Sequence, residues 1–95
     1  MTHAFATLIA RPETVDAVRD ALAALVGPSR DEDGCEHYEL FQSTDEPTRF
    51  QTVERWASPE AVRAHLGSDH VQAAFAAAGE LLGAEPVIQT FAKVS

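Results

Sequence analysis

The chain has 95 residues, a formal net charge of −8, 45% hydrophobic residues and a single cysteine. This length and composition predict one folded domain over residues 1–95, and the acidic charge disfavours nucleic acid or an anionic membrane as a partner. No apolar run approaches the roughly 20 residues that span a bilayer, and the lone Cys35 cannot form an internal disulfide.

The first elements are predicted from periodicity. Residues 3–11 ("HAFATLIAR") are short, apolar and rich in strand-compatible types, so we expect a first strand there. Pro12 suits a first helical turn, and apolar residues then recur at helical spacing until "GP" at 27–28, where we expect the helix to end. These apolar positions are Val15, Val18, Leu22 and Leu25. The start "MTHAFATLIARPE" does not resemble a signal peptide, so a cytoplasmic location is expected.

The middle of the chain predicts a hairpin followed by a helix. "CEHYELFQS" at 35–43 and "RFQTVERWA" at 49–57 are typical of strands, and the turn-rich "TDEPT" joins them. Ser58 is a suitable N-cap and Pro59 a suitable first helical residue, so a short helix should follow and end near Gly67.

The last part predicts a third helix and a fourth strand. "SD" at 68–69 can cap the helix, and Gly83 and Pro86 should end it. Its apolar stripe consists of Val71, Ala74, Phe75, Ala78 and Leu82. The closing "VIQTFAKV" at 87–94 is the expected strand.

The resulting order, β-α-β-β-α-α-β, is that of a ferredoxin-like α+β fold with a split βαβ arrangement and an antiparallel sheet. The first and last strands are apolar on both faces, whereas helices of this fold cover one face only. The uncovered apolar face predicts a homodimer joined sheet to sheet.

Three segments resemble the antibiotic biosynthesis monooxygenase domain, a family of dimeric α+β barrels. They are "DGCEHYEL" at 33–40, "RFQTVERWASPEAVRAHLGSDH" at 49–70 and "EPVIQTF" at 85–91, and the resemblance extends over nearly the whole chain. It implies a cavity between sheet and helices for a flat aromatic molecule, and oxidation of that molecule by O2 with neither metal nor flavin. The family also includes haem-degrading proteins and an isomerase, so the fold is better specified than the reaction.

The resemblance places Trp56 beside this cavity, where its indole would stack on a substrate or donate its N–H to a carbonyl. The alternative is a packed core residue at a strand end. Strand alternation puts Trp56 on the same face as Phe50, Thr52 and Glu54. Glu54 is a candidate substrate-binding residue, with a catalytic role as a second interpretation. If buried it would need a partner, and the conservative expectation is a pairing across the sheet or across the dimer.

Two histidines are candidates for a general base that removes a phenolic proton. His65 lies near the apolar stripe of its helix and should face the sheet, although a structural role is the alternative. His70 starts the next helix, where the positive helix end favours a neutral imidazole; the alternative is an exposed residue. Because five positions and Gly67 separate the two, they are not expected to form a metal pair, and no metal site is predicted.

Three further residues are candidate substrate contacts. Tyr38 and His37 should point to opposite faces of their strand, so Tyr38 either contacts substrate or packs in the core. The polyketide-oxidising and haem-degrading branches of the family use an asparagine near the tryptophan; this chain has none, and Thr52 is the nearest counterpart by position. Phe75 should pack its helix on the sheet and contribute to the pocket wall. It falls near the place of the haem branch's iron ligand, which disfavours haem degradation.

The resemblance, taken with these residues, implies a homodimeric, cofactor-independent monooxygenase acting on a small quinol or other electron-rich aromatic with O2. In this hypothesis His65 or His70 is the base, and Trp56 and Tyr38 position the ring. Two alternatives remain open: a binding or stress-response protein that holds an aromatic metabolite without converting it, and a cofactorless isomerase in which the histidines move a proton beside a carbonyl.

Overall fold

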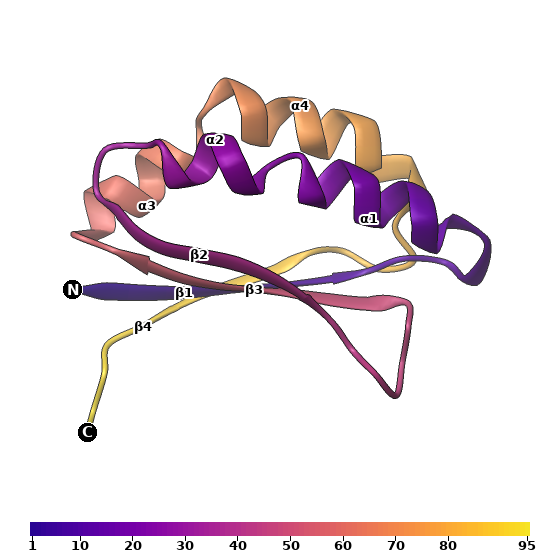
Figure 1. Cartoon of the computed structure of the whole chain (residues 1–95), viewed down its shortest axis with the longest axis horizontal. Coiled ribbons are helices and arrows are strands. Elements are labelled where there is room, and N and C mark those ends of the chain that lie inside the picture. Colours follow the sequence, from indigo (N-terminus) through magenta and orange to yellow (C-terminus); the bar gives the residue numbers. More distant parts are fainter.

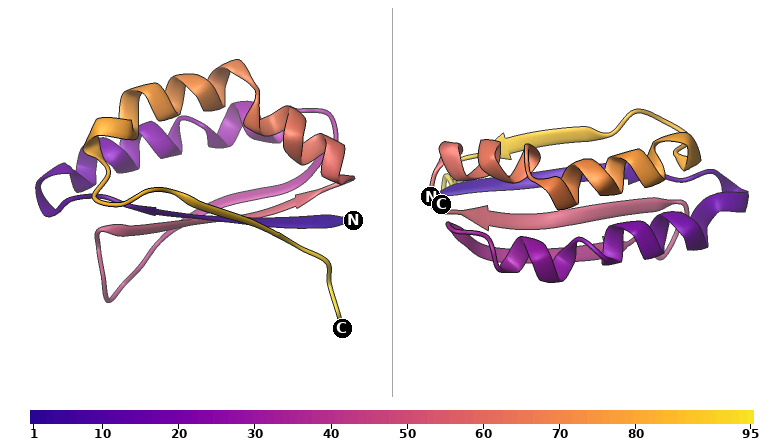
Figure 2. Two further views of the ribbon diagram at one scale, coloured as in Figure 1. Left: turned by 180° about the vertical axis from the view of Figure 1, so that it is seen from behind. Right: turned by 90° about the horizontal axis from the view of Figure 1, so that it is seen from above.

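The computed structural model describes residues 1–95 and shows a four-stranded antiparallel sheet with the helices on one face (Figures 1 and 2). The strand order is β2-β3-β1-β4, with β1 and β3 in the centre. The strands are β1 (Thr2–Ile9), β2 (Cys35–Gln42), β3 (Arg49–Trp56) and β4 (Val87–Phe91); the helices are α1 (Val15–Ala23), α2 (Val26–Arg30), α3 (Pro59–Leu66) and α4 (Asp69–Ala78). The predicted ferredoxin-like fold is confirmed, and none of the helices is long and apolar enough to cross a membrane.

The helix-facing side of the sheet holds the core. Strand alternation turns Ala4, Ala6 and Leu8 of β1 inward, and on β3 it turns the predicted set inward: Phe50, Thr52, Glu54 and Trp56. The larger apolar cluster lies under α1 and α4. A smaller one, formed by Ala4, Tyr38, Trp56 and Val62, lies under α3. The polar residues Thr52 and Glu54 therefore lie on the core side of the sheet, where a buried polar group must find a partner.

Capping positions the two helices after β3 as predicted. The Ser58 hydroxyl accepts a hydrogen bond from the Ala61 backbone N–H at 3.2 Å and begins α3. The Ser68 hydroxyl accepts from the Val71 N–H at 3.4 Å and begins α4. Gly67 separates the helices, so the chain turns sharply between His65 and His70.

The "GP" pair does not stop the helical path, and that prediction was wrong. After α1 the chain forms α2, with Pro28 at its third residue. The first four N–H groups of a helix have no partner inside the helix, so the missing N–H of proline costs nothing there. The short helix carries the chain on to Asp31 and Glu32 before β2 begins.

The third helix is shorter than its apolar stripe predicted. It ends at Ala78 and is followed by the 3₁₀ turn Gly79–Leu81. Leu82 has extended backbone angles and forms an isolated bridge with Ala10, so it leaves the helical stripe for the edge of the sheet. Phe75, also in the stripe, is only half-buried.

The other face of the sheet is apolar and has no cover within the chain (Figure 1). Phe5 and Phe91 pack edge to face there, with ring centroids 5.3 Å apart. Phe91 keeps 48% of its surface exposed, Val87 51% and Phe41 50%. The prediction that β1 is apolar on both faces is confirmed, and only one of these faces is covered.

Candidate functional site

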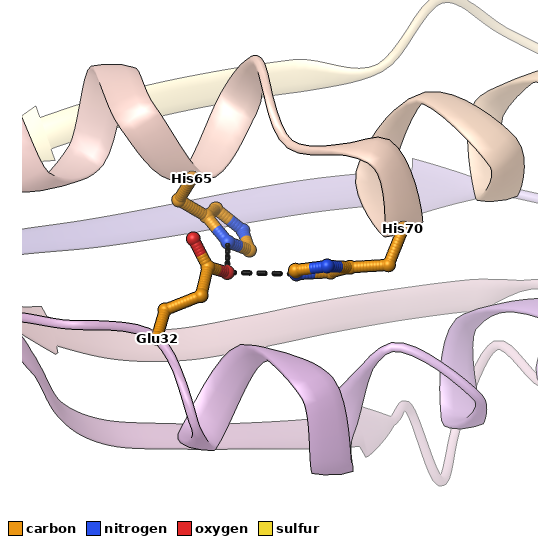
Figure 3. Close-up of side chains that lie close together, drawn as sticks. All are labelled: Glu32, His65 and His70. Carbon is orange, nitrogen blue, oxygen red and sulfur yellow. Dashed lines mark hydrogen bonds and ion pairs between the residues drawn. The ribbon is translucent and has the colours of Figure 1, made fainter.

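Two histidines and one carboxylate meet between α3, α4 and the turn after α2 (Figure 3). Nδ1 of His65 lies 2.6 Å from Oε2 of Glu32, and Nε2 of His70 lies 2.8 Å from the same oxygen. An ionised carboxylate only accepts hydrogen bonds, so both of these nitrogens carry the proton. We call these three residues the Glu32 cluster.

The local structure explains why the histidines converge although five positions separate them. The Gly67 break turns the chain, and the Ser68 hydroxyl donates to the His65 carbonyl at 2.6 Å while lying 3.3 Å from Nε2 of His70. The spacing argument against a metal pair considered only a single helical face, whereas the structure brings both rings to one carboxylate across the break. The break is what directs both rings toward Glu32.

A second buried carboxylate lies beside the Glu32 cluster. Glu54 is 4% exposed and accepts hydrogen bonds from Thr52 Oγ1 at 2.5 Å and from Trp56 Nε1 at 2.8 Å. Thr52 Oγ1 in turn accepts from the Ala6 backbone N–H at 3.0 Å. The expected partner across the sheet was wrong. Both hydrogen-bond donors to Glu54 come from β3 itself, because side chains two apart on one strand share a face. Oε1 of Glu54 also lies 3.9 Å from Nε2 of His65.

The His65 ring is held between two aromatic side chains. Its centroid is 4.6 Å from that of Trp56 and 5.5 Å from that of Tyr38. Trp56 is 0% exposed and its N–H is taken by Glu54, as its interpretation as a packed core residue predicts. Burial, reinforced by the Glu54 carboxylate, raises the pKa of the Tyr38 hydroxyl, so that group stays protonated at neutral pH. Both rings shape the surroundings of His65 rather than an open pocket.

His70 is the member of the Glu32 cluster that reaches an open hollow. Its side chain is 26% exposed, against 4% for His65. The hollow, about 300 Å³, lies between α1 and α4, which run side by side in Figure 2. It is lined by Ala21, Ala24, Leu25, His70, Ala73, Ala74 and Ala77. His70 is therefore the one polar side chain in an apolar lining.

The structure brings together six of the seven residues singled out from the sequence. Thr52, Glu54, Trp56, Tyr38 and both histidines form one connected set of contacts. Phe75 is not among them, because it lines a separate hollow with Gly79 and the segment 82–86.

Sequence reasoning missed Glu32, which connects the histidines. It lies in the acidic stretch "SRDEDG", where nothing distinguishes it from its neighbours Asp31 and Asp33. The usable signal was the hairpin: Cys35 pairs with Trp56, so residues before β2 must lie beside residues after β3. The Ala57 N–H donating to the Gly34 carbonyl at 2.8 Å continues this pairing toward the cluster.

The Glu32 cluster combines groups that can accept, pass and donate protons, and its three donor atoms, which lie within 4.8 Å of one another, are also of metal-binding types. The carboxylate fixes the tautomer of each ring, because it holds one N–H of each. The other nitrogen of each imidazole, Nε2 of His65 and Nδ1 of His70, is then the atom that carries a lone pair. Only His70 presents its ring to the apolar hollow.

Comparisons with known proteins agree with this fold. A model of the family described as "Antibiotic biosynthesis monooxygenase" matches residues 1–77. "Putative monooxygenase Rv0793" of Mycobacterium tuberculosis is 39% identical over 77 residues, covering 81% of this chain and 75% of the relative. "Putative monooxygenase YcnE" of Bacillus subtilis is 32% identical over 74 residues, covering 78% of each.

The structural comparison extends over almost the whole chain. The solved structure of Rv0793 superposes with a TM-score of 0.91 at 33% identity, covering 99% of this chain and 95% of that one. This includes β4, which lies beyond the residues matched by the family model. The chain belongs to the antibiotic biosynthesis monooxygenase family.

Proposed function

We propose that this protein is a monooxygenase that oxidises a quinol or another electron-rich phenolic aromatic with O2, and that the substrate itself supplies the electrons. Family membership supports the reaction type, because both relatives carry the name "Putative monooxygenase". The observation that carries the proposal is His70: it lines an apolar hollow and is hydrogen-bonded through Glu32 to a second, buried histidine.

His70 acts as the general base in this proposal. Glu32 accepts the Nε2–H hydrogen bond, which leaves Nδ1 to take the phenolic proton, and the carboxylate then stabilises the imidazolium that forms. Removing that proton raises the electron density of the ring, which makes electron transfer to O2 easier. Glu32 is a positioning residue, because it acts through His70.

His65 holds Glu32 from the other side. Its Nδ1–H fixes the carboxylate oxygen, and the rings of Trp56 and Tyr38 fix His65. Thr52 and Glu54 complete this support, since Glu54 accepts the Trp56 N–H. We propose that these residues position the base rather than contact the substrate.

The reaction balances without an added reductant. For a quinol, one oxygen atom of O2 enters the ring as a hydroxyl, and the other leaves as water with the two quinol hydrogens. For a ring methylene flanked by aromatic carbons, one oxygen atom becomes the new carbonyl and the other leaves as water with both methylene hydrogens. The alanine-rich walls suit a flat ring, and a ring bound against them would displace water from the hollow.

We also propose that the working form is a homodimer joined through the uncovered sheet face. Phe5, Val53 and Phe91 lie together on that face by register, away from the Glu32 cluster. Pairing two such faces would remove the exposed apolar surface of both chains from water.

Oxygen consumption tests the proposed function. Purified, chelator-treated protein is assayed with reduced naphthoquinols, benzoquinols and anthrones, beside His70→Ala, Glu32→Gln and His37→Ala. We expect uptake above the spontaneous rate, a loss of about 100-fold in His70→Ala on the scale of a general base, a smaller loss in Glu32→Gln, and wild-type rates in His37→Ala.

Two results would contradict the proposal. Oxygen uptake that is unchanged in His70→Ala would show that His70 is not the general base. No uptake with any substrate, combined with quenching of Trp56 fluorescence by the same ligands, would favour the binding protein; turnover that continues under nitrogen would favour the isomerase.

A further inference from the structure

We infer that the Glu32 cluster is also a binding site for a divalent transition-metal ion such as Zn²⁺, one ion per chain. The inference goes beyond the proposed oxygenase and does not depend on it, because it stands on the donor atoms and their geometry. Two imidazole nitrogens and one carboxylate oxygen, all within 4.8 Å of one another, form a donor set that suits Zn²⁺ and its first-row neighbours.

The distances are close to those of a coordinated ion. Glu32 Oε2 lies 2.6 Å from His65 Nδ1 and 2.8 Å from His70 Nε2. Ligand bonds of about 2.1 Å in a tetrahedral site separate neighbouring donors by about 3.4 Å. To admit the ion, the carboxylate oxygen therefore withdraws by less than about 1 Å from each imidazole, and the two imidazole nitrogens, which lie within 4.8 Å of one another, approach each other by up to about 1.4 Å. Such a shift lies within the reach of a Glu side chain on a turn.

The ion would replace the hydrogens that now join these three residues. Each neutral imidazole shifts its proton to its other nitrogen, and the nitrogen facing Glu32 then offers a lone pair. For His65 the proton moves to Nε2, which lies 3.9 Å from Oε1 of Glu54. A metal-bound histidine commonly donates its other N–H to a carboxylate, and Glu54 stands where that carboxylate is needed.

The local charge also favours a cation. Glu32 and Glu54 together carry two negative charges beside two histidines that remain neutral in the bound state, so a divalent ion would be balanced. Arg30 is the nearby cationic side chain, and its Nε donates to the Tyr38 carbonyl rather than to either carboxylate. The partial exposure of His70 and Glu32, 26% and 16%, leaves a route for entry.

The chain contains a matched control for weak histidine–carboxylate binding. His37 Nε2 lies 2.5 Å from Glu39 Oε1 on the open face of β2, with both side chains about half exposed. This pair has one imidazole and one carboxylate but no third donor, so it should bind an isolated ion far more weakly than the Glu32 cluster.

Calorimetric titration of ZnCl₂ into metal-stripped, tag-free protein tests the inference. We expect one ion per chain in the wild type, a loss of affinity of tenfold or more in His70→Ala and in Glu32→Gln, and wild-type binding in His37→Ala. Both affected residues are partly exposed, and circular dichroism checks that each variant is folded. Cu²⁺ adds a second readout: it should quench Trp56 fluorescence stoichiometrically, since that indole packs on His65.

Two results of the titration would overturn the inference. The first is Zn²⁺ binding that is retained in His70→Ala and lost when one of the two histidines outside the cluster is replaced, in His37→Ala or His3→Ala. The second is the absence of saturable binding in the wild type. If the oxygenase is also correct, bound Zn²⁺ should inhibit oxygen uptake and a chelator should restore it. Calorimetry needs no substrate. If the oxygenase assay fails, the titration therefore still decides whether the Glu32 cluster binds the metal ion.

Discussion

Individual side chains decide how Glu54 is kept inside the sheet–helix core. A buried carboxylate is costly unless hydrogen-bonded, and both of its oxygens have a donor from β3. Strand alternation predicted that Thr52, Glu54 and Trp56 share a face, because that property is local. It did not predict which of them pair, because pairing depends on side-chain rotamers and on the depth of burial.

Removing one hydrogen-bond donor of Glu54 should lower the free energy of unfolding. Thr52→Val keeps the side-chain shape but deprives Glu54 Oε2 of its donor and the Ala6 N–H of its acceptor. We expect a loss of about 1–3 kcal/mol in the free energy of unfolding, measured by urea denaturation. The control is Thr90→Val, which replaces an exposed threonine on β4 and should change the free energy of unfolding little. Equal urea midpoints for the two variants would contradict the assigned network.

The Cys35 thiol should react slowly with alkylating reagents. Partial burial raises the pKa of the Cys35 thiol, outweighing the lowering effect of a hydrogen bond with the His37 backbone, and the carboxylates of Glu32 and Glu54 raise it further. A higher pKa means less thiolate at a given pH. We expect alkylation by iodoacetamide at pH 8 to be slower in the folded protein than in urea, followed by mass spectrometry. A faster reaction in the folded state would contradict this environment.

At the scale of elements, strands and caps were predictable, whereas the path between them was not. Ser58 and Ser68 begin helices because their hydroxyls accept nearby N–H groups, a short-range effect visible in the sequence. The "GP" pair was misleading because the effect of a proline depends on its place in the helix. The hairpin pairing indicates that residues before β2 lie beside residues after β3. It does not indicate which acidic residue reaches the histidines, because α2 sets where the following turn begins.

Two glycines flanking this segment should respond in opposite ways to alanine. Gly34 has φ of +85°, and an added Cβ would lie 2.9 Å from the Ala61 Cβ, so Gly34→Ala should destabilise the fold by about 1–3 kcal/mol. Gly27 lies in α2 with nothing within 4 Å of such a Cβ, so Gly27→Ala should be neutral or stabilise by up to about 1 kcal/mol. Thermal melting of both variants checks this. Stability changes of the same sign in both variants would show that the turn before β2 does not have the described conformation.

For the whole molecule, the sequence indicated that the sheet needs a second cover, and the structure leaves that face open. The alternation of side chains along β1 shows that a second cover is needed, because the apolar Phe5 and Ile9 point away from the helices. What covers the face is not contained in one chain. A second copy is the simplest cover, since the same apolar residues would meet themselves across a two-fold axis.

A charge placed in the centre of that face should separate the dimer. Phe91 packs against Phe5 and is 48% exposed, so Phe91→Glu would bury a carboxylate in the proposed interface. We expect light scattering after size exclusion to give twice 10.3 kDa for the wild type and a single 10.3 kDa for the variant. Val94→Glu makes a similar change where the side chain is 99% exposed and should stay dimeric. A wild-type monomer, or a dimeric Phe91→Glu, would show that this sheet face is not where two chains meet.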